Sequence, residues 1–160
     1  SNHSLFKRFI QFGSLRSIMQ IQHILVVCVG NICRSPMAEY LLKQEFPELQ
    51  IHSAGIQGLT GHPADEKALL CMQRLNLDMH NHIAKKLDAQ MLKQADLVLV
   101  MSQNQQKHIE RTWPFTKGKT FRLGHWQQCD VADPYQHDQA MFDQTCQLIQ
   151  TCIADWKNYI

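Results

Sequence analysis

The sequence has no long hydrophobic run, no marked excess of one charge and no paired-cysteine metal motif. No stretch approaches the ~18 consecutive apolar residues that a membrane-spanning helix needs, so stable membrane insertion is not expected. The net charge is only +2 and the Lys and Arg residues are scattered, which argues against a nucleic-acid partner. There is no CxxC pair. The pairs His80/His82 and His125/Cys129 are each isolated from a second pair of ligands, so no metal site is predicted.

A disulfide framework is not expected either. The chain of 160 residues is long enough to bury a core without covalent cross-links, and its six cysteines are not spaced as in small secreted scaffolds. No convincing secretory signal precedes the first expected strand. We therefore expect reduced thiols and a cytoplasmic protein.

The first 18 residues differ in composition from the rest of the chain. They are basic and apolar and contain no acidic residue. We expect residues 1–18 to be an N-terminal extension, either an expression remnant or a disordered upstream segment, with Met19 as the natural start. A membrane-surface helix is the alternative. Residues 19–160 are expected to form a single domain, because no repeat, low-complexity tract or linker interrupts them.

From Met19 onward, strand and helix patterns alternate. Short apolar runs rich in β-branched residues predict strands, and runs with helical spacing of apolar residues predict helices. The expected strands are 23–29, 49–53, 96–101 and 120–123, and the expected helices are 35–46, 64–75, 87–95, 102–111 and 141–156. This order predicts an α/β fold, a three-layer sandwich with a central four-stranded parallel sheet flanked by helices on both faces. Such sheets bind ligands outside the carboxyl ends of their strands, which directs attention to the loop after Cys28.

The loop between Cys28 and Arg34 has the features of an anion-binding catalytic loop. The five residues between them can curl backbone N–H groups around a tetrahedral dianion, and Gly30 is expected to relax the backbone for that curl. The helix that starts near Ser35-Pro36 aims its positive end at the same point. Arg34 can donate two parallel hydrogen bonds to phosphate oxygens. These groups favour a nucleophilic thiolate at Cys28.

Two further loop residues are expected to support the nucleophile. Ser35 can donate a hydroxyl hydrogen bond to the thiolate or to the leaving sulfur. Asn31 tolerates left-handed backbone and can tie the loop together. With Arg34 and the amide cradle in place, the chemistry needs no metal or other cofactor.

A general acid is expected late in the chain, in Asp133-Pro134-Tyr135. A phenol leaving group has a pKa near ~10, so its expulsion at neutral pH requires a proton donor, and Asp133 is the candidate. Pro134 stiffens the loop, and Tyr135 offers an aromatic face to a substrate ring. We expect a deep pocket walled by Val29, Ile32 and Tyr135, with Leu59 added, in which a long aryl phosphate reaches Cys28 and phosphoserine does not. We expect Trp126 to anchor its loop by packing rather than to form a wall of the site.

The run VCVGNICRSPMAE resembles the signature of the low-molecular-weight protein tyrosine phosphatases, and the resemblance covers residues 20–160. Ser-Ala-Gly at 53–55, DLVLVM at 96–101 and the late Asp-Pro-Tyr match the family as well. The resemblance implies that Cys28 is the nucleophile that forms a phosphocysteine, Arg34 the phosphate clamp and Asp133 the general acid and base. The residues expected to bind phosphate or substrate are Val29, Gly30, Asn31, Ile32, Cys33, Ser35 and Tyr135.

Within the family, the LGHW and HIER runs resemble bacterial enzymes associated with capsule or exopolysaccharide export. This branch implies a phosphotyrosine protein substrate, the tyrosine-rich tail of an autophosphorylating tyrosine kinase. One departure from the eukaryotic members is Gln136, which follows Tyr135 where they have a second tyrosine. A double-tyrosine phosphorylation switch is therefore not expected.

Two alternatives share the fold. A thiol-coupled arsenate reductase needs two more cysteines close together on a mobile segment, but those after the loop are dispersed, and the two in the last helix are expected to pack in the core. A protein arginine phosphatase usually carries Thr where Ile32 stands, and Ile32 favours phosphotyrosine. Cys33 is either a small packed residue or the partner that captures an oxidised Cys28 in a reversible disulfide.

Overall fold

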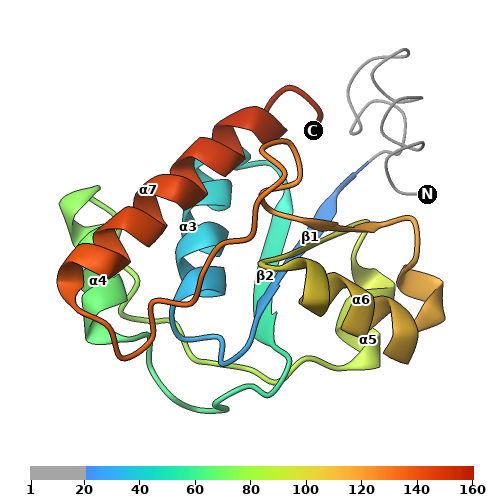
Figure 1. Ribbon diagram of the computed structural model, residues 1–160, viewed down its shortest axis with the longest axis horizontal. Helices are drawn as coiled ribbons and strands as arrows, with labels where there is room; N and C mark the ends of the chain where they lie inside the picture. Colours follow the sequence, from blue (N-terminus) through green and yellow to red (C-terminus); the bar gives the residue numbers. More distant parts are fainter. Residues whose placement is uncertain (1–20) are drawn as a thin grey trace.

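A parallel sheet lies at the centre of the protein (Figure 1). The computed structural model describes residues 21–160, so the expectations for residues 1–18 lie outside the described residues. Within 21–160 the sheet has four strands in the order β2-β1-β3-β4, and all of its strand pairs are parallel. The strands are β1 (His23–Cys28), β2 (Gln50–Gly55), β3 (Leu97–Val100) and β4 (Thr120–Arg122).

Helices cover both faces of this sheet (Figure 1). On one face, α3 (Arg34–Glu45), α4 (Glu66–Arg74) and α7 (Gln139–Trp156) pack into the larger core. On the other, α5 (Ala89–Gln94) and α6 (Gln103–Thr112) pack into a smaller one. A short 3-10 helix, η1 (Pro114–Thr116), which the sequence did not predict, precedes β4. The predicted three-layer α/β sandwich is confirmed.

Strand β1 is buried because it lies between the two cores. Ile24, Val26 and Cys28 face the larger core, whereas Leu25 and Val27 face the smaller one. Alternate side chains of a strand point to opposite faces, so a strand covered on both sides needs an unbroken apolar run. This arrangement also brings the end of β1 to the edge of the sheet where its connecting loops gather.

Most helices begin at a polar cap that the sequence supplies. The side chains of Asp65, Asp88, Ser102 and Asp138 each accept a hydrogen bond from a backbone N–H in the first turn of α4, α5, α6 and α7. Helix α3 differs, because its N-cap residue is Cys33, with no side-chain cap bond. Ser35, expected at or near that cap, is the second residue of the helix, and its hydroxyl is used elsewhere.

None of the helices within residues 21–160 is both long enough and apolar enough to cross a lipid bilayer.

Candidate active site

Cys28 is the last residue of β1 and lies at the base of a cavity of about 300 Å³. The catalytic-loop candidate (residues 28–35) forms one wall, and segments from two other loops complete it. The lining residues are Cys28, Val29, Gly30, Ile32, Cys33, Arg34, Gln57, Leu59, Asp133 and Tyr135. Two sets of residues that are a hundred positions apart in the sequence are thus brought to one site, as the sequence predicted.

The backbone of the loop turns its carbonyl groups outward. Six consecutive carbonyls accept hydrogen bonds from surrounding groups: Cys28 from Ile56 N, Val29 from Gln57 N and Gly58 N, Gly30 from Leu59 N, Asn31 from His82 Nε2, Ile32 from Asp65 N and Cys33 from Met37 N. Within a planar trans peptide the N–H points opposite to the C=O, so the amides of residues 29–34 face inward. One of them, Asn31 N–H, donates to Cys28 Sγ at 3.3 Å. The loop is therefore a ring of donors around the sulfur.

Asn31 holds this curl in place. Its φ is +62°, and its fully buried side chain donates from Nδ2 to Ser35 Oγ (2.8 Å) and Ser53 Oγ (2.9 Å). Its Oδ1 accepts from the backbone N–H of Lys85 at 2.9 Å. Both features expected of Asn31 are present. The expectation for Gly30 needs correction, because its φ is not in the left-handed region and Asn31 makes the tight turn instead.

A buried hydrogen-bond chain leads from Asn31 to the sulfur. Ser53 Oγ donates to Glu39 Oε1 at 2.5 Å and accepts from Asn31. Ser35 Oγ also accepts from Asn31 and lies 2.9 Å from Cys28 Sγ. Each polar atom in the chain thus has a partner, and when the sulfur is a thiolate the Ser35 hydroxyl is the donor to it.

His82 belongs to this network and not to a metal pair. It is buried, and its Nε2 lies 2.7 Å from the carbonyl oxygen of Asn31. Because a carbonyl only accepts, Nε2 carries the proton. His80 is exposed and contacts Asp78. Across residues 21–160, no three His, Cys, Asp or Glu side chains gather in a way that could hold a metal ion.

Arg34 presents one edge of its guanidinium to the cavity. The side chain is buried, and its Nη1 donates to the carbonyl of Val131 at 2.8 Å. The opposite edge carries Nη2, which lies 3.5 Å from Asp133 Oδ2, and Nε, which is buried without a hydrogen-bond partner among the described residues. A buried donor without a partner is costly unless a ligand satisfies it. The Nε and Nη2 pair matches the bidentate geometry that an oxyanion accepts.

Asp133 and Tyr135 close the cavity from the other side. The Asp133 carboxylate is 45% exposed, and its Oδ1 accepts from the backbone N–H of Tyr135 at 3.1 Å. The Tyr135 side chain is also about half exposed. An open carboxyl beside an aromatic rim leaves space for a substrate ring between them.

Cys33 lines the same cavity as Cys28 but differs in chemistry. Burial, together with the nearby negative charge of Asp65, strongly raises the pKa of the Cys33 thiol, so it stays protonated at neutral pH. Cys33 is thus poorly suited to be a nucleophile itself. Its role as a partner for an oxidised Cys28 stays a prediction.

Several residues of the site were not predicted from the sequence. Gln57 lines the cavity, while Ser53, Glu39 and His82 brace the loop from behind. The Ser-Ala-Gly match to the family was the only sequence signal for Ser53. Nothing in the sequence indicated that Glu39 and His82 would have buried partners in the site. Trp126 does not line the cavity: it stacks on Tyr159 at 3.7 Å between ring centroids, as expected for a loop anchor.

Comparisons with known proteins agree with this geometry. The family described as low molecular weight phosphotyrosine protein phosphatase matches residues 23–160. A low molecular weight protein-tyrosine-phosphatase Ptp of Acinetobacter johnsonii is 72% identical over 142 residues, which cover 89% of this chain and all of that protein.

Solved structures match as well. The crystal structure of the tyrosine phosphatase AmsI of Erwinia amylovora aligns with a TM-score of 0.83 at 38% identity, covering 86% of this chain and 92% of that one. Wzb of Vibrio vulnificus in complex with benzylphosphonate aligns with a TM-score of 0.82 at 36% identity, covering 85% and 97%.

Proposed function

Because the chain belongs to the low molecular weight phosphotyrosine protein phosphatase family, we propose that it hydrolyses phosphotyrosine in proteins with Cys28 as the nucleophile. The observation that carries the proposal is the loop of residues 28–35, in which the carbonyls of residues 28–33 all accept hydrogen bonds from outside the loop. Its inward amides form a preorganised site for a tetrahedral oxyanion around a sulfur atom. The benzylphosphonate bound by the Vibrio vulnificus relative is an anion of this kind joined to an aromatic ring.

In the first step, the Cys28 thiolate attacks phosphorus in line with the phenolic oxygen. The inward amides and the Nε and Nη2 edge of Arg34 hold the three equatorial oxygens, where negative charge lies in the transition state. Asp133, at the open side of the cavity, donates a proton to the departing oxygen. The arriving phosphate competes with Asp133 for Arg34 Nη2.

In the second step, water hydrolyses the phosphocysteine. Asp133, now deprotonated, accepts a proton from the attacking water, while the leaving sulfur regains its bond from Ser35. The hydroxyl of Ser35 is already oriented by Asn31, so it stabilises the thiolate in both steps without reorganisation. This accounts for the buried chain that ends at Glu39.

The walls of the cavity favour an aryl phosphate. Val29, Ile32, Leu59 and Tyr135 provide apolar or aromatic surface above the sulfur, suited to a phenyl ring. Arsenate reduction and arginine dephosphorylation are not favoured. Cys71, Cys146 and Cys152 are buried away from the cavity, and Ile32 offers no hydroxyl to a guanidinium.

The finer substrate we propose is the phosphorylated tyrosine-rich tail of a bacterial tyrosine autokinase. Its support is the resemblance to enzymes associated with capsule or exopolysaccharide export. Release of phosphate from such an autophosphorylated kinase by the wild-type protein would be the direct measurement.

The test compares Cys28→Ser and Asp133→Ala with the wild type on a series of aryl phosphates. Cys28→Ser should be inactive, because a serine hydroxyl is a far weaker nucleophile in this loop. Asp133→Ala should keep a burst of phenol when the leaving group is acidic but lose about 10²–10³-fold in turnover, with the largest loss for leaving groups of high pKa. Stopped-flow and steady-state rates check both. Equal rates for all three proteins on every substrate would refute the assigned roles.

A further inference from the structure

The C-terminal half of α7 is covered by the loop that follows β4, here called the post-β4 loop (residues 123–130). Three contacts run along the helix: Trp156 Nε1 donates to the Leu123 carbonyl (2.7 Å), Gln127 Nε2 donates to Asp155 Oδ2 (3.1 Å), and the Trp126 and Trp156 rings meet edge-on at 5.6 Å. The loop is therefore fixed against one face of α7. This interface is separate from the catalytic cavity.

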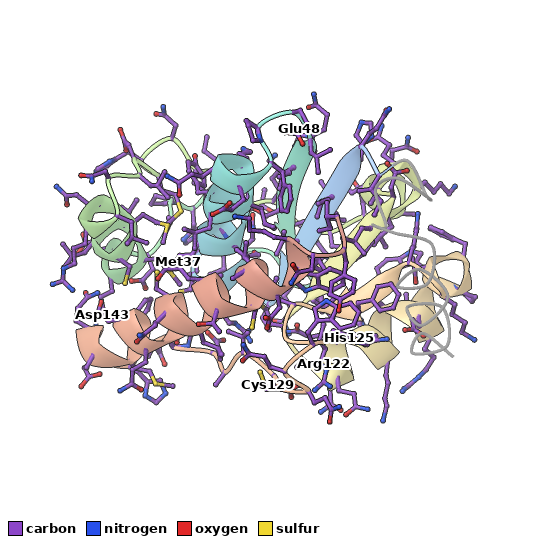
Figure 2. The ribbon with its side chains drawn as sticks, turned by 90° about the horizontal axis from the view of Figure 1, so that it is seen from above. Met37, Glu48, Arg122, His125, Cys129 and Asp143 are labelled. Carbon is purple, nitrogen blue, oxygen red and sulfur yellow. The ribbon has the colours of Figure 1, made fainter. Side chains whose placement is uncertain are left out.

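Two thiols meet in this interface. Cys152 lies three and four positions before Asp155 and Trp156, so its side chain is on the same helical face. The Cys152 side chain is buried, and Cys129, at the end of the post-β4 loop, lies close enough to raise the pKa of the Cys152 thiol. The Cys129 sulfur packs against Gly124, next to the Leu123 carbonyl that accepts from Trp156, one helical turn from Cys152. Cys129 is partly exposed and is labelled in Figure 2. Both cysteines are free.

We propose that Cys129 and Cys152 are a second oxidisable site, which a peroxide converts into a disulfide. The sulfur of the accessible Cys129 attacks the O–O bond, which gives a sulfenic acid and one water. Cys152 then attacks that sulfur, the S–S bond forms, the S–O bond breaks, and the departing hydroxide leaves with the Cys152 proton as a second water. The two thiols lose two electrons and two protons, and hydrogen peroxide is reduced to two waters.

The order of the steps follows from exposure. Cys129 is the thiol that solvent reaches. Burial and the contact with Cys129 raise the pKa of Cys152 to about 12, which makes Cys152 the slower, resolving partner.

The other buried cysteines on this side of the sheet are less suited to this reaction. The Cys71 thiol donates to Asp143 Oδ1 at 3.2 Å and accepts from Gln139 Nε2 at 3.3 Å, so it is already engaged. Cys146 is buried on α7 near Asp143. Cys146 therefore provides a matched control on the same helix.

The disulfide would fix the base of the loop that carries the proposed acid. Next to Cys129, Asp130 accepts from Arg122 Nη1 (3.0 Å) and from the backbone N–H of Gln103 (3.1 Å), and Val131 accepts from Arg34. A link at Cys129 would thus tie this segment to α7. Neither cysteine lines the catalytic cavity, so the link leaves the cavity open.

The experiment uses the full chain with Cys28→Ser, in which the catalytic thiol cannot react. The protein is treated with hydrogen peroxide, free thiols are alkylated, and peptides are mapped by mass spectrometry. We expect a cross-linked peptide pair containing Cys129 and Cys152, a melting temperature higher by about 5 °C, and reversal of both by dithiothreitol.

Three further variants control this result. Cys146→Ser added to Cys28→Ser should keep the cross-link, whereas added Cys129→Ser should abolish it and the rise in melting temperature. Cys152→Ala is a second way to remove the pair. A Cys129 recovered as a sulfinic acid or in alkylated form, or a Cys152 linked to another cysteine, would overturn the proposal.

Discussion

Because Gly55 has no side chain, the backbone of the catalytic loop can pack directly against it. It ends β2, directly beside the loop of residues 28–35, and a Cβ added there would lie 2.5 Å from the Val29 carbonyl oxygen and 2.9 Å from the Asn31 nitrogen. Both atoms are backbone and belong to the anion cradle, so neither can move without deforming it. Gly30, inside the loop, has more room, because its added Cβ would meet Leu59 Cδ1 at an ordinary 3.5 Å.

We therefore expect Gly55→Ala to damage both stability and catalysis. Overpacking against backbone should cost about 2–3 kcal/mol in the free energy of unfolding. The displaced amides should lower kcat/KM by about 10²-fold, since small errors in the position of catalytic groups are costly. Urea denaturation and aryl phosphate kinetics check the two effects. Gly30→Ala is the control for stability alone, and it should lower the free energy of unfolding by less than about 1 kcal/mol. Equal losses of stability in Gly55→Ala and Gly30→Ala would contradict the steric argument.

Among the elements, α4 and α7 are joined by one carboxylate. Asp143 on α7, labelled in Figure 2, accepts from Gln139 Nε2 at 3.0 Å, from Cys71 Sγ at 3.2 Å and from Arg74 Nη1 at 2.9 Å. The hydrogen bond from Gln139, then that from Cys71, and the charge of Arg74 lower the pKa of Asp143 below its usual 3.8. The ionised form is thus the one that the folded state favours.

The sign of the pH effect follows from this shift. A pKa that is lower in the folded than in the unfolded state adds stability above pH ~4, and this stability is lost as the pH falls through the folded-state value. Asp143→Asn should therefore unfold at a lower urea concentration than wild type at pH 7, and the difference should be smaller at pH 3. Urea midpoints at both pH values provide the measurement. An equal difference in urea midpoint at both pH values would show that the charge of Asp143 is not the cause.

At the same scale, the sequence predicted nearly every element but not how the loops pack. The runs at 23–29 and 96–101 predict strands because a buried parallel strand needs apolar residues on both sides. By contrast, segment 56–65 wraps the catalytic loop through backbone N–H groups, which leave no side-chain pattern. Segment 82–87 reaches it through His82 Nε2 and Lys85 N. The left-handed turn at Asn31 was foreseen from its residue type. The contact of Cys129 with Cys152 was not, because only the fold brings those positions together.

For the whole molecule, β1 links two separate cores. Its neighbours Val26 and Val27 are both fully buried, one facing α3 and α7 and the other facing α5 and α6. Since the strand is shared, neither core can lose its packing without exposing the other. The two faces should therefore unfold together.

Val26→Ala and Val27→Ala test this coupling. Each should cost about 2 kcal/mol, because each leaves a small cavity in a packed core. Both variants should show a single transition in urea, with the same midpoint by tryptophan fluorescence and by far-ultraviolet circular dichroism. Two separate transitions in either variant would mean that the cores are independent.

The outward carbonyls of residues 28–33 separate the chemistry of the protein from its choice of substrate. Apart from Arg34, the groups proposed to hold the oxyanion are main-chain amides, which every amino acid except proline provides. The side chains of Val29, Ile32 and Leu59 line the cavity and make none of the hydrogen bonds that hold the curl. Such an arrangement is readily evolvable: drift or directed redesign at the rim can change which phosphorylated ring is accepted while the reactive centre stays intact.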